Sequence, residues 1–314
     1  MSSGPLARTT RSVDAGRSRL GASLLALALV ALAAGCAGVA RAPGDLSRPG
    51  TLREASPQAL GNVIEARRAA LRGLSGTAKL QVSIDDTRGG ETVRERLRAS
   101  QAVLVEAPSS FRLEALSPFG VTYAVASDGS ELAILVPGER TVYRGPATAP
   151  AIGMATGVQA TAAEATEVLL GLPPVPPLSL SGAWVSSGRE AGLATGTLPG
   201  EIEPTVLLHA FSAEAPGDTF VVGFARLPES ETAPVVAVFF ERITANGEKV
   251  LEARFGNFRM IDGVPVATSI TVRTPHAEAI LQYADVTLNP PVERTRFSLA
   301  TPAGMREAPL VPPA

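Results

Sequence analysis

The chain is poor in the residues that usually build catalytic and metal sites. Its 314 residues include one cysteine, Cys36, so we expect neither an internal disulfide nor a cysteine-based metal site. The two histidines, His209 and His276, lie far apart and outside the HExxH spacing of zinc sites. The sequence also has no Gly-x-Ser-x-Gly elbow, phosphate loop or dinucleotide fingerprint. These absences predict a non-enzymatic protein with no catalytic residue, no metal and no cofactor.

Charge is also scarce, since only 18% of the residues are charged and the formal net charge is −2. A chain with so little net charge has no strong field to attract nucleic acid, so we expect no nucleic-acid partner. Three arginines, Arg94, Arg96 and Arg98, alternate along one segment and are suited to attracting phospholipid headgroups. A solvated strand face is the simpler interpretation of that pattern.

The one long apolar run, Leu20–Ala34, has the length and flanks of a secretory signal peptide. Four arginines come before it (Arg8, Arg11, Arg17 and Arg19), and small residues lead from its end to Cys36. The segment Leu32–Cys36, LAAGC, resembles the lipobox of bacterial lipoproteins, in which the cysteine is lipidated and becomes the first mature residue. A secretory signal cut elsewhere is the first alternative, and an uncleaved signal anchor is the second.

Composition divides the chain into four predicted parts. Residues 1–35 form the lipoprotein signal peptide, and residues 36–55, which are small, polar and rich in proline and glycine, form a flexible tether. Residues 56–305 form one folded domain, and residues 306–314 form a flexible tail. No later apolar run approaches the length of a membrane span, so we expect a protein that is anchored by Cys36 and does not cross the membrane.

Two helices are predicted in the domain. Ser56 is a suitable N-cap, Pro57 suits the first helical position, and Gly73 is a plausible stop for the apolar stripe between them. The second helix lies in an insert rich in alanine, proline and glycine, residues 145–177, where Thr161 and Glu164 have capping-box spacing.

Elsewhere the apolar residues alternate with period two, which is typical of strands with one buried face. The first such run is Leu74–Ile84, and about a dozen similar runs follow, separated by turn signals such as Asn246-Gly247 and Asp262-Gly263. The pattern predicts a mainly β fold with one large antiparallel sheet, whose edges must be curled, closed or covered, and the two predicted helices are the obvious covers.

Several segments resemble the LolA/LolB superfamily of lipoprotein carriers. Residues 74–79, LSGTAK, resemble the opening strand of LolB, and residues 111–120, FRLEALSPFG, resemble a strand and turn before its fourth strand. Residues 257–265 and 286–291 resemble the carboxyl half of LolB-like lipoproteins. The chain is longer than LolB around residues 186–235. The resemblance implies a single antiparallel, incompletely closed (half-open) β-barrel, with the N-terminal helix and the helical insert covering its concave face. It also implies a hydrophobic cavity for acyl chains.

The resemblance also implies site residues. The turn Pro118-Phe119-Gly120 matches the loop with which LolB helps insert cargo into the membrane; a plug folded under the turn is the alternative for Phe119. Ordinary core packing is the alternative for each of the inward-facing residues that we expect to line the cavity, which are Leu80, Val82, Val103, Leu113, Ile134 and Phe239.

The sequence therefore favours a lipoprotein on the periplasmic face of the outer membrane. Ala37, directly after the cysteine, also resembles the residue at that position in lipoproteins destined for the outer membrane. Its expected partners are the acyl chains of lipoproteins or lipids, the membrane itself, and a periplasmic LolA-like carrier as donor. The alternative is a structural or assembly lipoprotein that binds a protein partner in the cell envelope. A carboxylate-based hydrolase is a third, weaker hypothesis.

Overall fold

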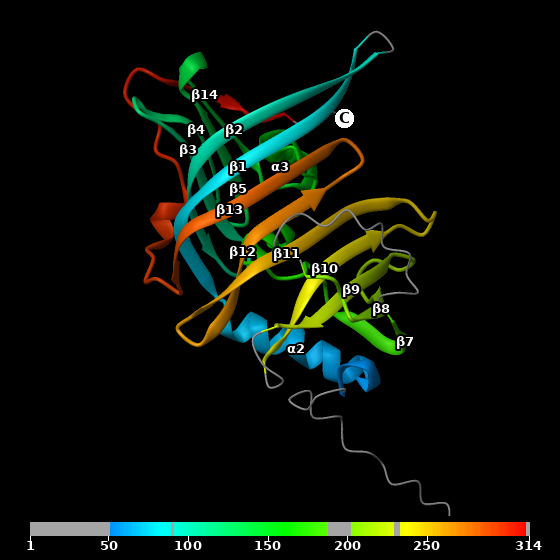
Figure 1. Ribbon diagram of the computed structural model, residues 1–314. Coiled ribbons are helices and arrows are strands. Elements are labelled where there is room, and N and C mark those ends of the chain that lie inside the picture. The colour runs from blue at the N-terminus through cyan, green and yellow to red at the C-terminus, as the bar shows by residue number, and fades with distance from the viewer. Residues whose placement is uncertain (1–50, 89–90, 188–201, 229–232, 312–314) are drawn as a thin grey trace, which may run out of the picture. The chain divides into compact units, whose positions relative to one another are not determined.

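The computed structural model describes residues 51–88, 91–187, 202–228 and 233–311, all within one compact unit, Pro43–Ala314 (Figure 1). The predicted signal peptide, Cys36 and most of the tether lie outside the described residues. Among the helices described, none is long and apolar enough to cross a membrane.

The unit is built on one sheet of fourteen strands whose two ends do not pair with each other. The order across the sheet is β14-β6-β5-β4-β3-β2-β1-β13-β12-β11-β10-β9-β8-β7, and every pair is antiparallel except β14 with β6. The strands are β1 (Gly73–Arg88), β2 (Glu91–Glu106), β3 (Ser110–Ser117), β4 (Gly120–Ser127), β5 (Glu131–Val136), β6 (Thr141–Pro146), β7 (Leu178–Ser187), β8 (Val206–Ser212), β9 (Thr219–Arg226), β10 (Val235–Ile243), β11 (Lys249–Ile261), β12 (Val264–Arg273), β13 (Ala277–Leu288) and β14 (Arg306–Pro309). The prediction of a mainly β, incompletely closed barrel with helices is confirmed.

Three α-helices are present in the described part of the chain: α2 (Pro57–Ala70), α3 (Ala149–Thr156) and α4 (Ala162–Leu169). Short 3-10 turns occur at η2 (Thr51–Glu54), η3 (Pro137–Glu139) and η4 (Arg294–Phe297). Figure 1 shows the sheet curling around α3, with α2 below β10 in this view. Contacts place α2 against β7 and β10, α3 against β5, and α4 against β2 and β3.

The caps explain where the helices begin and end. The Ser56 hydroxyl accepts a hydrogen bond from the Ala59 N–H at 3.2 Å, as the sequence predicts for α2. The predicted stop at Gly73 is wrong: α2 ends at Ala70 because Leu71 turns into the core, and Gly73 begins β1. The capping box of Thr161 and Glu164 is present at the start of α4.

Both predicted flexible ends of the domain need correction. Within the predicted tether 36–55, residues Thr51–Glu54 form a 3-10 turn, and Leu52 and Ala55 are buried in the core. Within the predicted tail 306–314, residues Arg306–Pro309 form β14, which pairs in parallel with β6. Both segments become ordered because they gain apolar burial or backbone hydrogen bonds that composition alone does not reveal.

The main core lies on the inner face of the sheet, beneath α2. It contains four fully buried phenylalanines of strands β9–β11 together with Leu60 and Ile64 of the helix, and the phenylalanines are Phe220, Phe224, Phe240 and Phe255. At about 25 cal/mol per Å², aromatic side chains of this size dominate the burial energy of a core. This end of the unit is therefore densely filled.

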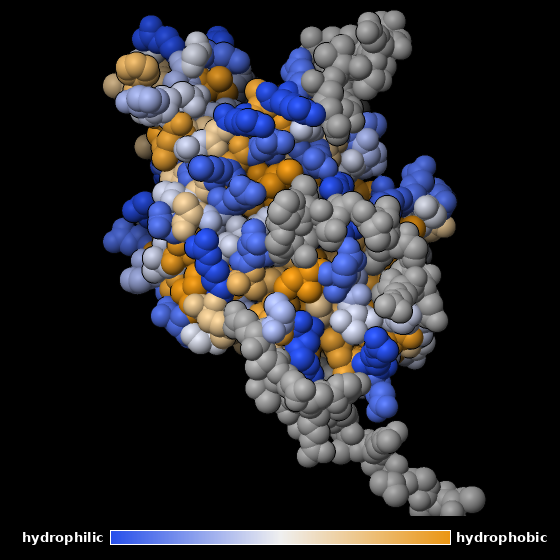
Figure 2. Space-filling model, in the orientation of Figure 1, coloured by the Kyte–Doolittle hydropathy of each residue, from blue (hydrophilic) through white to orange (hydrophobic). Residues whose placement is uncertain are grey.

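The opposite face of the same strands carries buried charges. Glu252 lies within ion-pair distance of Arg254 (2.9 Å), Arg273 (3.1 Å) and Lys249 (3.6 Å). Burial alone would raise the pKa of Glu252, but its three cationic partners outweigh burial and lower the pKa. Figure 2 shows hydrophilic residues on the face turned toward the viewer, with hydrophobic residues exposed between them.

Candidate functional site

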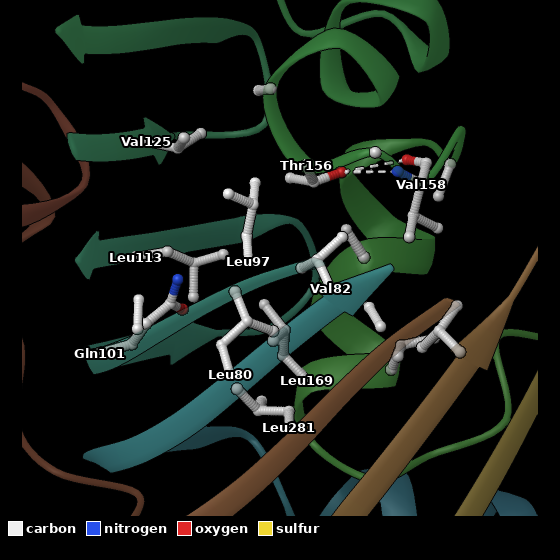
Figure 3. Close-up of a pocket in the computed structure, with 18 of the residues that line it drawn as sticks. Leu80, Val82, Leu97, Gln101, Leu113, Val125, Thr156, Val158, Leu169 and Leu281 are labelled. Atoms are coloured by element: carbon white, nitrogen blue, oxygen red, sulfur yellow. Dashed lines mark hydrogen bonds between the residues drawn. The ribbon is translucent and has the colours of Figure 1, made fainter. Parts of the chain in front are cut away.

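A large apolar cavity lies between the inner face of the sheet and helices α3 and α4. Its volume is about 720 Å³. Strands β1–β4 form one wall, β11–β13 form another, and α3, α4 and the segment between them complete it (Figure 3). This volume lies within the range of small-molecule sites, which is roughly 300–1,000 Å³.

Small side chains leave this space empty. The lining includes glycine and alanine from both helices and from three strands: Gly153, Ala155, Gly157, Ala160, Ala165, Ala99, Ala115 and Ala279. Leucine, valine and isoleucine make up most of the remaining wall, together with Phe111, Tyr123 and Met154, and Arg98 is the one charged residue among the lining residues. The surface is therefore suited to aliphatic chains and offers few polar groups to a ligand.

The cavity has an open end and a closed end. Leu97 and Met154 belong to its lining and are 60% and 50% exposed, so they lie at the mouth. Farther along the inner face of β2, Val103 and Val105 are buried in the main core. The mouth therefore lies toward the β1–β2 hairpin, and the floor adjoins the core.

Two tyrosines attach the helices to the sheet. The Tyr123 hydroxyl on β4 donates to the Ala155 carbonyl of α3 at 2.9 Å, and the Tyr283 hydroxyl on β13 donates to the Leu169 carbonyl of α4 at 2.8 Å. Burial raises the pKa of Tyr123 to about 12 and raises that of Tyr283 as well, so both hydroxyls keep their protons near neutral pH.

Two ion pairs hold α4 from outside the cavity. Glu164 pairs with Arg242 of β10 at 2.5 Å, and Glu167 pairs with Arg68 of α2 at 2.7 Å. Arg68 also donates to the Val175 carbonyl. Helix α4 is thus a wall of the cavity that is fastened at its surface by polar contacts.

One polar side chain of the lining has no partner. Gln101 of β2 is 6% exposed, and its Oε1 atom accepts no hydrogen bond from any described residue. The Thr156 hydroxyl, by contrast, lies 2.8 Å from the Ile152 carbonyl and is satisfied within α3 and its end. Sequence analysis missed Gln101, although it is the polar exception in the inward row of β2.

Five of the six predicted lining residues lie on the inner face of the sheet, in two groups. Leu80, Val82 and Leu113 line the cavity. Val103 and Ile134 face inward but are packed in buried clusters.

Phe239 was assigned to the wrong face of the sheet. It packs on the outer face, where the Arg254 guanidinium lies 5.3 Å from its ring centre. A β-bulge between Ala237 and Phe239 shifts the alternation by one residue, so Phe240 faces inward in its place.

The turn between β3 and β4 exposes the predicted insertion residue. Ser117 pairs with Gly120, which leaves Pro118 and Phe119 at the tip. Phe119 is fully exposed, and Gly120 adopts a φ of 115°, a conformation that favours glycine. The alternative in which Phe119 folds under the turn as a plug does not hold.

The remaining candidates lie away from the cavity. His209 stacks on Trp184 at 4.8 Å between ring centres, and its Nε2 lies 2.8 Å from the Ser186 hydroxyl. His276 lies in the turn between β12 and β13. Within the described ranges, no group of three histidine, cysteine, aspartate or glutamate side chains is placed to hold a metal ion.

No protein-family model matches the sequence, and no curated protein matches it either. Among solved structures, the chain is similar to a LolA superfamily protein from Nitrosomonas europaea, with 13% identity and a TM-score of 0.42 over 76% of this chain and 97% of that one. It is also similar to a DUF1329 family protein from Desulfovibrio piger, with 11% identity and a TM-score of 0.42 over 77% of this chain and 95% of that one.

A third similar structure is an outer membrane lipoprotein-sorting protein domain from Vibrio parahaemolyticus. The identity is 11% and the TM-score 0.39, over 77% of this chain and 95% of that one.

Proposed function

We propose that the protein is a lipoprotein anchored through Cys36 to the periplasmic face of the outer membrane, where its cavity receives acyl chains of lipoproteins or lipids and helps place them in the membrane. The observation that carries the proposal is an apolar cavity of about 720 Å³ in a protein of this length. A well-packed core leaves few voids larger than a water molecule, so a space of this size points to a ligand.

The lining fits the chemistry of acyl chains. Each buried methylene contributes about 0.8 kcal/mol, and an aliphatic chain needs no directed polar contact for that gain. The absence of a catalytic motif in the sequence accords with a site that binds and releases a ligand without changing it.

Helices α3 and α4 are the elements that would move to admit a ligand. Each has eight residues and is fastened to the sheet by one tyrosine hydrogen bond, while α4 also pairs with Arg242 of β10 and with Arg68 of α2. Each helix also buries an apolar side chain, Ile152 in α3 and Val168 in α4. The polar contacts contribute about 1 kcal/mol each, so we expect α3 and the cavity-facing side of α4 to separate from the sheet at a lower cost than the core beneath α2.

The first test is the lipid that copurifies with the unit Pro43–Ala314. We expect mass spectrometry of a gentle extract to find acyl lipids or lipopeptides with the wild-type unit and at least tenfold less with Ala99→Trp, which places an indole in the cavity. Ser100→Trp is the matched control, because Ser100 is exposed on the other face of the same strand. Wild-type protein without any bound lipid would argue strongly against a carrier.

The second test concerns delivery to the membrane. Phe119→Glu removes an exposed aromatic that suits the lipid interface, so we expect transfer of bound lipid to vesicles to slow at least fivefold with folding unchanged. Val311→Glu, which also replaces an exposed apolar residue, is the control. Loss of folding together with transfer would instead identify Phe119 as a structural residue.

A structural or assembly lipoprotein that binds a protein partner is the second candidate. The observation in its favour is an exposed aromatic cluster on β7 and β8, where Trp184 and Phe211 lie 6.0 Å apart between ring centres. If this is the functional surface, Trp184→Ala would abolish function in cells while lipid copurification stayed at the wild-type level.

A further inference from the structure

Gln101 is the polar exception in an otherwise apolar row. The inward residues of β2 run from the mouth to the core in the order Leu97, Ala99, Gln101, Val103 and Val105. Gln101 is 94% buried, and neither end of its amide is hydrogen-bonded to a described residue. A buried amide without partners is destabilising, and leucine would fill the same position without that penalty.

The amide lies at the floor of the cavity. Gln101 lines the cavity, whereas the next inward residue, Val103, belongs to the packed core. Leu97 at the mouth is four residues away, which is about 13 Å along a strand. The mouth and the amide therefore mark the two ends of the β2 wall.

The neighbours leave the amide free to meet a ligand. Its partners on the adjacent strands are Ala78 of β1 and Ala115 of β3, the smallest side chains that can occupy those inward positions apart from glycine. Figure 3 shows the side chain of Gln101 beside Leu113 and Leu80, among the lining residues. A ligand that reaches the floor would contact the amide directly.

A carboxamide presents one donor and one acceptor side by side. A ligand end that both donates and accepts, such as a hydroxyl or an uncharged carboxylic acid, satisfies both atoms. An ester accepts only, and the tip of an aliphatic chain does neither, so both leave Oε1 without a partner.

We infer that the cavity selects single-chain amphiphiles, of the fatty acid or fatty alcohol type, which bind with an uncharged donating and accepting end at Gln101 and the chain directed toward Leu97 and Met154. This inference rests on the proposed function, because it names the ligand class of the same acyl-chain site. It separates such ligands from lipoproteins, whose acyl chains enter tail first.

The charged and titratable residues of the lining leave the polar end of the ligand without a charged partner, so that end has to be neutral. Arg98, the one charged lining residue, is exposed, and its Nε donates to Gln81 Oε1 at 3.2 Å. Tyr123, the titratable lining residue on β4, is engaged with Ala155 and stays protonated. Because none of the described lining residues places a cation at the floor and apolar burial raises the pKa of a carboxyl, a fatty acid binds with uptake of a proton and binds more tightly at lower pH.

The test is calorimetric titration of the purified full-length chain with decan-1-ol, decanoic acid and methyl decanoate. We expect the alcohol to bind about tenfold more tightly than the ester. The acid should bind at least tenfold more tightly at about pH 6 than at about pH 8, whereas the alcohol should show no pH dependence.

Gln101→Leu removes the amide and retains a side chain of similar length. We expect this variant to bind the ester as tightly as the alcohol, which would be the loss of a roughly tenfold preference. Gln58→Leu is the control: it makes the same substitution at an exposed residue of α2 that does not line the cavity, so the preference should persist.

The outcomes separate this inference from the proposed function. Equal binding of alcohol and ester to the wild-type protein, or an unchanged preference in Gln101→Leu, would overturn the role of Gln101 and leave the acyl cavity intact. Failure of the wild-type protein to bind any of the three ligands, with Ala99→Trp behaving identically, would overturn the cavity itself as a ligand site.

Discussion

The two halves of the inner face of the sheet are filled in opposite ways. Beneath α2, strands β9–β11 present phenylalanines that are at most 2% exposed. Beneath α3 and α4, strands β1–β3 line a cavity of about 720 Å³ mainly with alanine, leucine and valine, and Phe111 is the one aromatic that these strands place there. Both halves are apolar, and both follow the same alternation, so hydrophobicity does not distinguish them. The difference is the volume of the side chains.

The covering helices differ in the same way. Helix α2 has fourteen residues and buries Leu60 and Ile64 in the core. Helices α3 and α4 have eight residues each and turn Gly153, Ala155 and Ala165, among others, toward the cavity. A densely packed half can thus support a half that stays open to a ligand.

The largest expected effect on stability comes from truncating a large side chain in the packed half of the inner face, compared with the same change in the half that contains the cavity. Phe240→Ala should lower the free energy of unfolding by about 4 kcal/mol, because it leaves a new void in a filled core. Leu113→Ala should lower it by only about 1–2 kcal/mol, because Leu113 already borders empty space. Urea denaturation measures both, and equal losses would contradict the contrast between the halves.

The second effect concerns the charges behind the packed half. Glu252→Gln should lower the free energy of unfolding by about 3 kcal/mol near neutral pH, because it leaves buried Arg254 with one fewer anion. The pKa of Glu252 is lowered in the folded state, so its contribution is complete above the ordinary value of 4.5 and is lost as the pH falls through the folded value.

Denaturation at several pH values should therefore show that the difference in free energy of unfolding between wild type and Glu252→Gln becomes smaller below about pH 4. Glu131→Gln is the matched control, since its pair with Arg144 is half-exposed and contributes less than about 1 kcal/mol. A difference in free energy of unfolding that grows as the pH falls would show that the pKa of Glu252 is not lowered in the folded state.

The smallest expected effect on stability comes from enlarging an alanine side chain in the packed half and in the half that contains the cavity. Ala253→Leu in β11 should destabilise by about 2 kcal/mol, because the fully buried core has no room for the added carbons. Ala279→Leu in β13 faces the cavity, so it should change stability by less than about 1 kcal/mol and reduce lipid binding. Thermal unfolding and lipid copurification provide the two measurements.

Much of the fold could be predicted from sequence because it depends on local signals. The cap at Ser56, the capping box at Thr161 and the two-residue turn at Asp262-Gly263 are properties of a few neighbouring residues. Helix α3 carries similar local signals, since Thr148 caps its start and Gly157, with a φ of 77°, ends it. The Asn246-Gly247 turn was placed correctly but lies within a longer loop.

The candidate site was less predictable because it depends on distant segments. Strand parity identified Leu80, Val82 and Leu113, but one bulge moved Phe239 to the outer face. Whether an inward residue lines a void or a core depends on the volumes that β11–β13, α3 and α4 bring opposite it. Gln101 becomes informative only when its lack of partners is known.

The position of β1 in the middle of the sheet determines when the unit can be completed. β1 pairs with β13, and the Arg72 N–H donates to Asn289 Oδ1 at 2.9 Å across 217 residues of chain. When the chain is synthesised from its N-terminus, the β1–β2 hairpin can form early. The other edge of β1 stays unpaired until β13 and almost all of the remaining strands have been made. Contacts this far apart predict slow folding, and the unpaired edge of β1 is a site where a chaperone or another chain can pair first.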